Sequence, residues 1–169
     1  TPSVSLAPAP ELRQGKQTTH FSIVDRAGNR VAATLSINTF FGSGFVAGNT
    51  GVLLNNEMDD FAIAQQGTNI YSLVHSGPNR IAPGKRPLSS MSPTFVEDGR
   101  GTLILGVPGG SRIISMVLLA ILQYQAQAPV DPQALVSAPR YHHQYLPDRL
   151  EVEPDAFPGA VLDELQLIG

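Results

Sequence analysis

The sequence predicts a layered α+β domain, because it combines two strand–turn–strand patterns with one long apolar helical segment. Residues 19–37 alternate apolar and polar side chains on both sides of a glycine-containing turn. Residues 94–105 repeat this pattern around Asp98-Gly99, and residues 111–127 are apolar on nearly every side of a helix. Strands grouped around helices that are covered on both sides are typical of layered domains.

The composition fits a globular domain and excludes several classes of protein. The 169 residues are 42% hydrophobic and 15% charged, which separates the chain from disordered sequences. The net charge of −3 and the lack of a Lys/Arg cluster argue against a nucleic-acid surface. The absence of cysteine excludes disulfides and thiolate metal sites. The longest apolar run, 113–122, is about half the length needed to cross a bilayer.

The turn of the first hairpin predicts its register. Residues 26–28 fit a three-residue loop with its glycine in the left-handed conformation. If Asp25 faces Asn29, counting outward along both strands brings Thr18 opposite Ser36. Two hydroxyl side chains are therefore expected side by side at the open end of this hairpin.

The remaining segments alternate loops with short elements. The proline-rich residues 1–17 predict a linker or tail. The apolar residues 52–54 predict a short buried strand. Residues 64–85 lack periodicity and predict a long loop, of a length that is usually functional or mobile. Asp131 is expected to cap a short helix, and a last helix is expected before Gly169.

Thr18 opens the first strand and is the candidate nucleophile. A threonine hydroxyl attacks poorly unless a neighbouring base removes its proton. A cut before Thr18 would free an α-amine on the same residue, with a pKa of about 7.7–8.0. Taken alone, a threonine at this position would more often be a simple strand former, so the assignment depends on the rest of the sequence.

Four blocks of the sequence, in chain order, resemble the small subunit of γ-glutamyltranspeptidase, an N-terminal-nucleophile hydrolase. They are TTHFS at 18–22, LNNEMDDF at 54–61, RPLSSMSP at 86–93 and PGGSR at 108–112. The resemblance runs from about Thr18 to Pro154. It implies a four-layer αββα sandwich, of which this chain supplies part, and self-cleavage between Gln17 and Thr18. Residues 1–17 would then be the tail of the large subunit, and 18–169 the small-subunit catalytic domain without its last strands.

The resemblance also implies a role for each residue of the site. The catalytic residues would be Thr18 as nucleophile, Ser36 as its hydroxyl partner in place of the family's usual threonine, and Gly109 and Gly110 as the oxyanion hole. The substrate contacts would be Asn38, Glu57 and Asp60 at the α-ammonium, Ser89 and Ser90 at the α-carboxylate, and Tyr71 as the shielding side chain of a lid. Glu57 stands where some members have glutamine. An arginine for the α-carboxylate is expected from the large subunit.

The implied activity is γ-glutamyl transfer or hydrolysis on glutathione and related γ-glutamyl amides. Water or an amino acid or peptide would be the acceptor, and the large subunit of the same precursor would be the partner. The resemblance places the enzyme in the periplasm or outside the cell. No cofactor is expected. No metal is expected either, because the adjacent His142 and His143 would point to opposite sides of an extended segment.

Two alternative functions stay open. A glutaryl-cephalosporin acylase of the same family would bind a side chain without the α-amine. Glu57 and Asp60 argue against it, because they would face a neutral chain. A processing-deficient relative with a non-catalytic binding role is the second alternative, and the intact Gln17–Thr18 bond in the sequence favours it.

Overall fold

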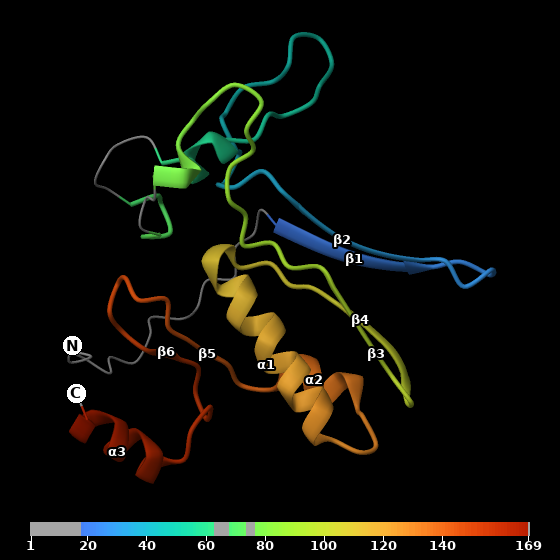
Figure 1. Ribbon diagram of the computed structural model, residues 1–169, viewed down its shortest axis with the longest axis vertical. Helices are drawn as coiled ribbons and strands as arrows, with labels where there is room; N and C mark the ends of the chain where they lie inside the picture. The colour runs from blue at the N-terminus through green and yellow to red at the C-terminus, as the bar shows by residue number, and fades with distance from the viewer. Residues whose placement is uncertain (1–17, 63–67, 74–76, 169) are drawn as a thin grey trace. The chain divides into compact units, whose positions relative to one another are not determined.

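The computed structural model describes residues 18–62, 68–73 and 77–168 (Figure 1). These residues form two compact units, 18–113 and 114–168. Strands and helices occur together, so the α+β class that the sequence predicts is confirmed at this level. The expected tail and the cleavage-site residue Gln17 lie outside the described residues.

The first unit begins with an antiparallel hairpin of β1 (Thr18–Val24) and β2 (Arg30–Ser36). Its register places Thr18 opposite Ser36, as predicted. The turn holds this register, because the Asp25 N–H donates to the Asn29 carbonyl at 3.0 Å. Gly28 supplies the left-handed conformation of the turn, with φ of 86°. The hairpin therefore delivers two hydroxyls to its open end.

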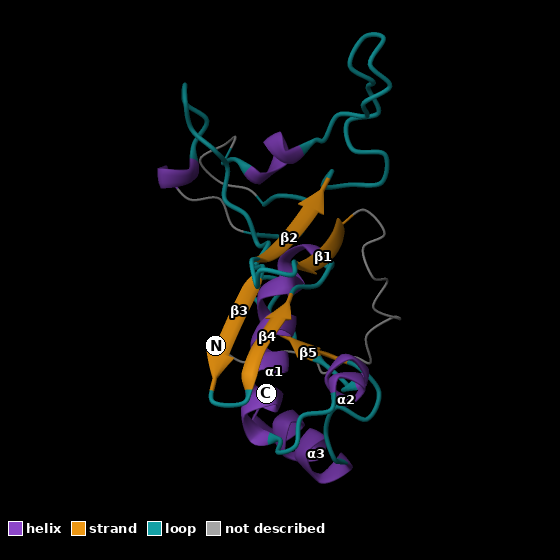
Figure 2. Ribbon diagram, turned by 90° about the vertical axis from the view of Figure 1, so that its right-hand side faces the viewer, coloured by secondary structure: helices purple, strands orange, loops and turns teal. Residues whose placement is uncertain are grey.

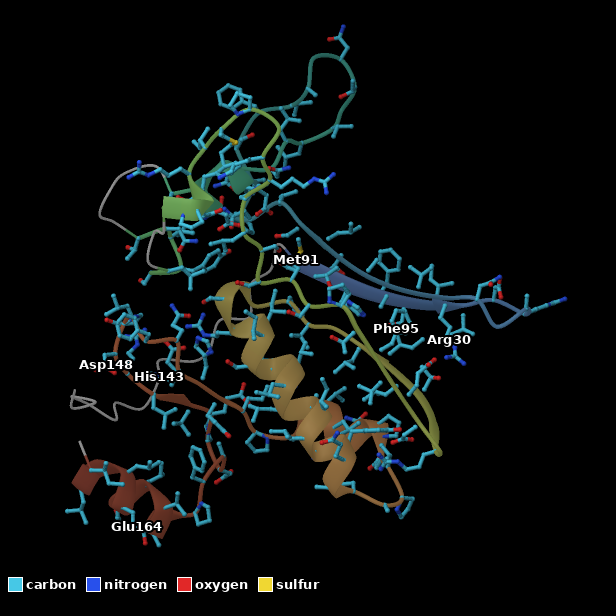
Figure 3. All side chains as sticks on the ribbon, in the orientation of Figure 1. Arg30, Met91, Phe95, His143, Asp148 and Glu164 are labelled. Carbon is cyan, nitrogen blue, oxygen red and sulfur yellow. The ribbon has the colours of Figure 1, made fainter. Side chains whose placement is uncertain are left out.

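A second antiparallel hairpin, of β3 (Thr94–Asp98) and β4 (Gly101–Leu105), belongs to the same unit, as predicted. The strand β4 lies next to β1 (Figure 1). Arg30 of β2, labelled in Figure 3, forms an ion pair with Glu97 of β3. Contacts between β1 and β4 and between β2 and β3 thus hold the two hairpins together.

The segment between the hairpins consists mostly of turns, with the short 3-10 helices η1 (Glu57–Asp60) and η2 (Gly77–Asn79). The expected buried strand at 52–54 is wrong. Leu53 forms an isolated bridge with Val46, while Val52 and Leu54 are exposed. The physical reason is that this stretch pairs with residues 45–47 as a narrow ribbon, and no layer of the described chain covers its faces.

The second unit carries most of α1 (Ile113–Ala126), which follows the 3-10 turn η3 (Gly110–Arg112). It also contains α2 (Pro132–Ser137), the strand pair β5 (Tyr141–His142) and β6 (Glu151–Val152), and α3 (Gly159–Ile168) (Figure 2). The predicted cap of α2 is confirmed, because the Asp131 carboxylate accepts the Gln133 N–H at 2.9 Å. Across the described ranges, no helix is both long and apolar enough to cross a membrane.

The helix α1 is covered on one side only, which corrects the expectation that it is covered on both sides. Met116 and Val117 are buried, but Ile114, Leu118 and Leu122, spaced four residues apart, are about half exposed. Residues at this spacing share one face of a helix. The described residues supply no layer over that face, so an apolar stripe is left uncovered.

Candidate active site

An open pocket lies in the first unit, at the open end of the first hairpin. Its walls come from β1, β2, η1, the segment 68–73, the serine-rich segment before β3, and the start of α1. The lining residues are Thr18, Ser36, Asn38, Glu57, Asp60, Tyr71, Leu73, Ser89, Ser90, Met91, Gly110, Ser111 and Ile113. The structure thus brings together nine of the residues expected at the site. Gly109 is adjacent to the pocket but does not line it.

The two hydroxyls at the end of the hairpin are in hydrogen-bond contact. Thr18 Oγ1 lies 3.0 Å from Ser36 Oγ. Ser36 Oγ also accepts the N–H of Asn38 at 3.0 Å, and its own hydrogen is directed to Glu57, so the Thr18 hydroxyl donates to Ser36. This arrangement fixes the direction of the Thr18 hydroxyl.

Asn38 forms the floor of the pocket beside these hydroxyls. It is buried and left-handed, with φ of 70°. Its side-chain amide donates to the Asn56 carbonyl at 3.2 Å, and its own carbonyl accepts the Tyr71 hydroxyl at 2.9 Å. Contacts on both sides therefore hold this backbone in a conformation that few residues other than glycine adopt.

Two carboxylates stand at the ends of η1. Burial, the hydrogen bond with Asp60 and the charge of Asp60 raise the pKa of Glu57 to about 7, while a hydrogen bond from Ser36 lowers it. Glu57 Oε1 is buried and has no hydrogen-bond partner among the described residues. A buried carboxylate oxygen without a partner is costly, so the site favours a bound cation or hydrogen-bond donor.

Tyr71 packs against the glycine at the start of η3. A Cβ atom on Gly110 would lie 2.4 Å from Cε1 of the Tyr71 ring, so only glycine allows this approach. Burial and the negative charges of Asp60, Glu57 and Asp59 raise the pKa of Tyr71, so the phenol stays protonated and can donate its hydrogen. The aromatic ring therefore forms a fixed wall of the pocket.

Asn69 holds Tyr71 in place, although the sequence did not mark it as a site residue. Asn69 is buried, and its side-chain oxygen accepts the Tyr71 N–H two residues later at 3.0 Å. This is an Asx turn, and an asparagine two residues before the aromatic is the local signal that could have indicated it.

The remaining expected residues come from backbone segments with few side-chain contacts. Ser89 Oγ accepts the Met91 N–H at 3.1 Å, which shapes the segment that brings Ser89 and Ser90 to the pocket. Gly109 and Gly110 have φ values of 144° and 59° and lead into η3 and α1. Backbone N–H groups at such a start favour negative charge.

The paired histidines of the second unit have partners of their own. Both ring nitrogens of His142 are hydrogen-bonded, to Ser115 Oγ at 2.8 Å and to Gln144 Oε1 at 2.7 Å. His143 points toward Asp148, 3.1 Å away (Figure 3). Over the described part of the chain, no group of three His, Asp or Glu side chains is placed to hold a metal ion.

Comparison with known proteins decides the family. The model of the family described as gamma-glutamyltranspeptidase matches residues 2–169. The chain belongs to the gamma-glutamyltranspeptidase family. It is 48% identical over 162 residues to the glutathione hydrolase proenzyme of Escherichia coli, covering 91% of this chain and 28% of that protein. It is 45% identical over 152 residues to the glutathione hydrolase proenzyme of a Pseudomonas species, covering 89% of this chain and 26% of that protein.

A solved structure of the gamma-glutamyltranspeptidase family agrees with the fold. A mutant of the Helicobacter pylori gamma-glutamyltranspeptidase superposes with a TM-score of 0.80 at 45% identity, covering 89% of this chain and 81% of that chain. The chain therefore spans little more than a quarter of the curated relatives' length and most of one solved chain.

Proposed function

We propose that this chain is the small-subunit part of an enzyme that transfers or hydrolyses γ-glutamyl groups of glutathione and related amides. The observation that carries this proposal is the pocket itself. It sets the Thr18 hydroxyl 3.0 Å from Ser36 and in the same cavity as the Glu57–Asp60 acid pair. A nucleophile beside a cation site suits an acyl donor with an α-ammonium group.

The proposed reaction begins with a cut between Gln17 and Thr18, which frees the α-amine of Thr18. The amine takes the hydroxyl proton as Thr18 Oγ1 attacks the γ-carbonyl carbon. The carbonyl oxygen becomes negative and is held by N–H groups at Gly109 and Gly110. The C–N bond then breaks, the leaving amine takes the proton, and a γ-glutamyl ester remains on Thr18. Water, or the amine of an amino acid or peptide, releases the acyl group.

Substrate recognition would use the charges of the pocket. The α-ammonium carries three donors, which suit Asn38, Glu57 and Asp60. In particular, it would supply the missing partner of Glu57 Oε1. Ser89 and Ser90 would hold the α-carboxylate, together with an arginine from the large subunit. A glutaryl group lacks the ammonium and would leave the acids unpaired, which disfavours the acylase alternative.

The proposed setting is a heterodimer made from one precursor. The relatives are named proenzymes, and the chain covers only part of them, which supports a second subunit. With that subunit we expect the four-layer αββα sandwich of N-terminal-nucleophile hydrolases. Because these relatives are bacterial, we propose a periplasmic or secreted location.

The test compares two chromogenic substrates on the purified precursor after cleavage. We expect turnover of γ-glutamyl-p-nitroanilide to exceed that of glutaryl-p-nitroanilide by about 100-fold or more, since a site built for a polar group rejects an analogue lacking it. Thr18→Ala should turn over neither substrate. Equal turnover of the two would favour the acylase. An uncut precursor that is inactive on both would favour a non-catalytic relative.

A further inference from the structure

One buried amide side chain connects the acid pair to the wall of the pocket. Asn69 is only 7% exposed, although it lies in an irregular segment. Its Nδ2 donates to Asp60 Oδ1 at 3.0 Å. Its Oδ1 accepts the N–H groups of Tyr71 and Leu73, each at 3.0 Å. Both ends of the amide are thus in use, one on a carboxylate and the other on the segment that carries Tyr71.

Further contacts hold the segment 68–73 in this arrangement. The Ser72 N–H donates to the Asn69 carbonyl at 2.9 Å, and the Ile70 N–H donates to Asp59 Oδ2 at 3.0 Å. The Tyr71 hydroxyl donates to the carbonyl of Asn38, which also lines the pocket. A shift of the Asn69 amide would therefore move Asp60 and Tyr71 together.

The charges around Asn69 explain why a neutral donor suits this position. Glu57, Asp59 and Asp60 are acidic, and Tyr71 faces the same pocket. No lysine or arginine is among the residues that line the pocket in the described chain. A cationic donor would neutralise Asp60 and compete with a bound ammonium, whereas an amide fixes the carboxylate and leaves its charge available.

We propose that Asn69 is a positioning residue, which orients Asp60 toward the substrate ammonium with its N–H₂ group and holds Tyr71 over the pocket with its oxygen. The proposal rests on the proposed function. It makes selectivity for an α-ammonium depend on a residue that does not touch the substrate.

The first test measures competitive inhibition of γ-glutamyl-p-nitroanilide turnover by L-glutamate and by glutarate, which lacks the ammonium. In Asn69→Ala, the inhibition constant of glutamate should rise about ten-fold or more, because Asp60 loses its hydrogen bond. The constant of glutarate should change less than about three-fold. A purely structural role would weaken both inhibitors equally, and that result would overturn the proposal.

A second variant keeps the segment 68–73 in place. Asn69→Asp retains the acceptor for Tyr71 and Leu73 but puts an oxygen against Asp60 Oδ1. The added carboxylate raises the pKa of the neighbouring acids, so the acidic limb of the pH profile of kcat/KM should move to higher pH. The matched control is Asn49→Asp, which adds the same charge at an exposed site and should leave the limb unchanged.

The outcomes distinguish a failure of the proposed function from a failure of the positioning role of Asn69. If the unmodified enzyme is cut but does not turn over γ-glutamyl-p-nitroanilide, the proposed function itself falls. If the enzyme is active and Asn69→Asp leaves the acidic limb in place, the positioning role is overturned and the function stands.

Discussion

At the scale of single residues, Glu57 is in the least satisfied environment of the pocket. One of its oxygens is buried and has no hydrogen-bond partner in the described part of the chain, and burial beside Asp60 raises its pKa to about 7. A proton on this carboxyl relieves the charge. A substrate ammonium would do the same, so the two compete for one place.

This competition predicts a pH dependence of substrate affinity. Below about pH 7 Glu57 is protonated, so the KM for γ-glutamyl-p-nitroanilide should rise as the pH falls through that value. Glu57→Gln has no proton to lose and should flatten this dependence. Steady-state kinetics on both sides of pH 7 measure it. An unchanged acidic rise of KM in Glu57→Gln would assign the titration to another group.

The same shift affects the stability of the folded chain. The pKa of Glu57 is raised from 4.5 to about 7 on folding, so the folded state binds the proton more tightly. This contribution to stability is complete below about pH 4.5 and is lost as the pH rises toward 7. In Glu57→Gln the melting temperature should therefore fall less over this range.

At the scale of elements, the two hairpins meet in a close contact beside the strand that begins at Thr18. A Cβ atom on Gly106, just after β4, would lie 2.1 Å from Nδ1 of His20 on β1. That nitrogen is hydrogen-bonded to Thr34 Oγ1 at 2.9 Å, so the ring is held on its own hairpin. Burial lowers the pKa of His20, which favours the neutral ring. His20 is two residues from Thr18, so this contact between the hairpins lies close to the site and supports it.

The close contact between Gly106 and His20 predicts that one substitution will destabilise the fold. Gly106→Ala should lower the free energy of unfolding by about 1–3 kcal/mol, because the added methyl group overlaps the imidazole. Denaturant unfolding measures the loss. His20→Ala makes room for that methyl group, so the two substitutions together should cost less than the sum of the separate losses. Strictly additive losses would show that the two residues are not coupled.

The sequence predicted the elements better than the contacts between them. The register of Thr18 against Ser36 could be counted from one turn, because alternation and the Asp25–Asn29 closure are local. The close approach of Gly106 to His20 joins residues far apart in the sequence, and no periodic pattern indicates it. The turn that Asn69 forms with Tyr71 is local, but its hydrogen bond to Asp60 joins two separate segments, and no pattern of the sequence indicates that contact.

At the scale of the whole molecule, large apolar side chains lie uncovered. Phe40, Phe41 and Phe45 are 63%, 63% and 72% exposed, and α1 shows a stripe of Ile114, Leu118 and Leu122. Because the chain covers 28% of its Escherichia coli relative, we expect other parts of the precursor to cover them.

The short span of the chain, compared with its relatives, also explains which predictions about the whole molecule succeeded and which failed. Composition and pattern predicted an α+β fold, which the structure shows. The expectation that α1 is covered on both sides was wrong, because the described chain supplies no layer over one of its faces. The pocket residues could be chosen only through the family resemblance, since an isolated Ser-Ser or Gly-Gly pair is common in turns.

The central claim is that Thr18 becomes an N-terminal nucleophile. The most direct test is the intact mass and N-terminal sequence of the purified precursor after prolonged incubation, with Thr18→Ala as control. We expect two fragments whose masses sum to that of the precursor plus one water, with the smaller beginning at Thr18, and an uncut control. A precursor that stays joined through Gln17–Thr18 would contradict the catalytic assignment.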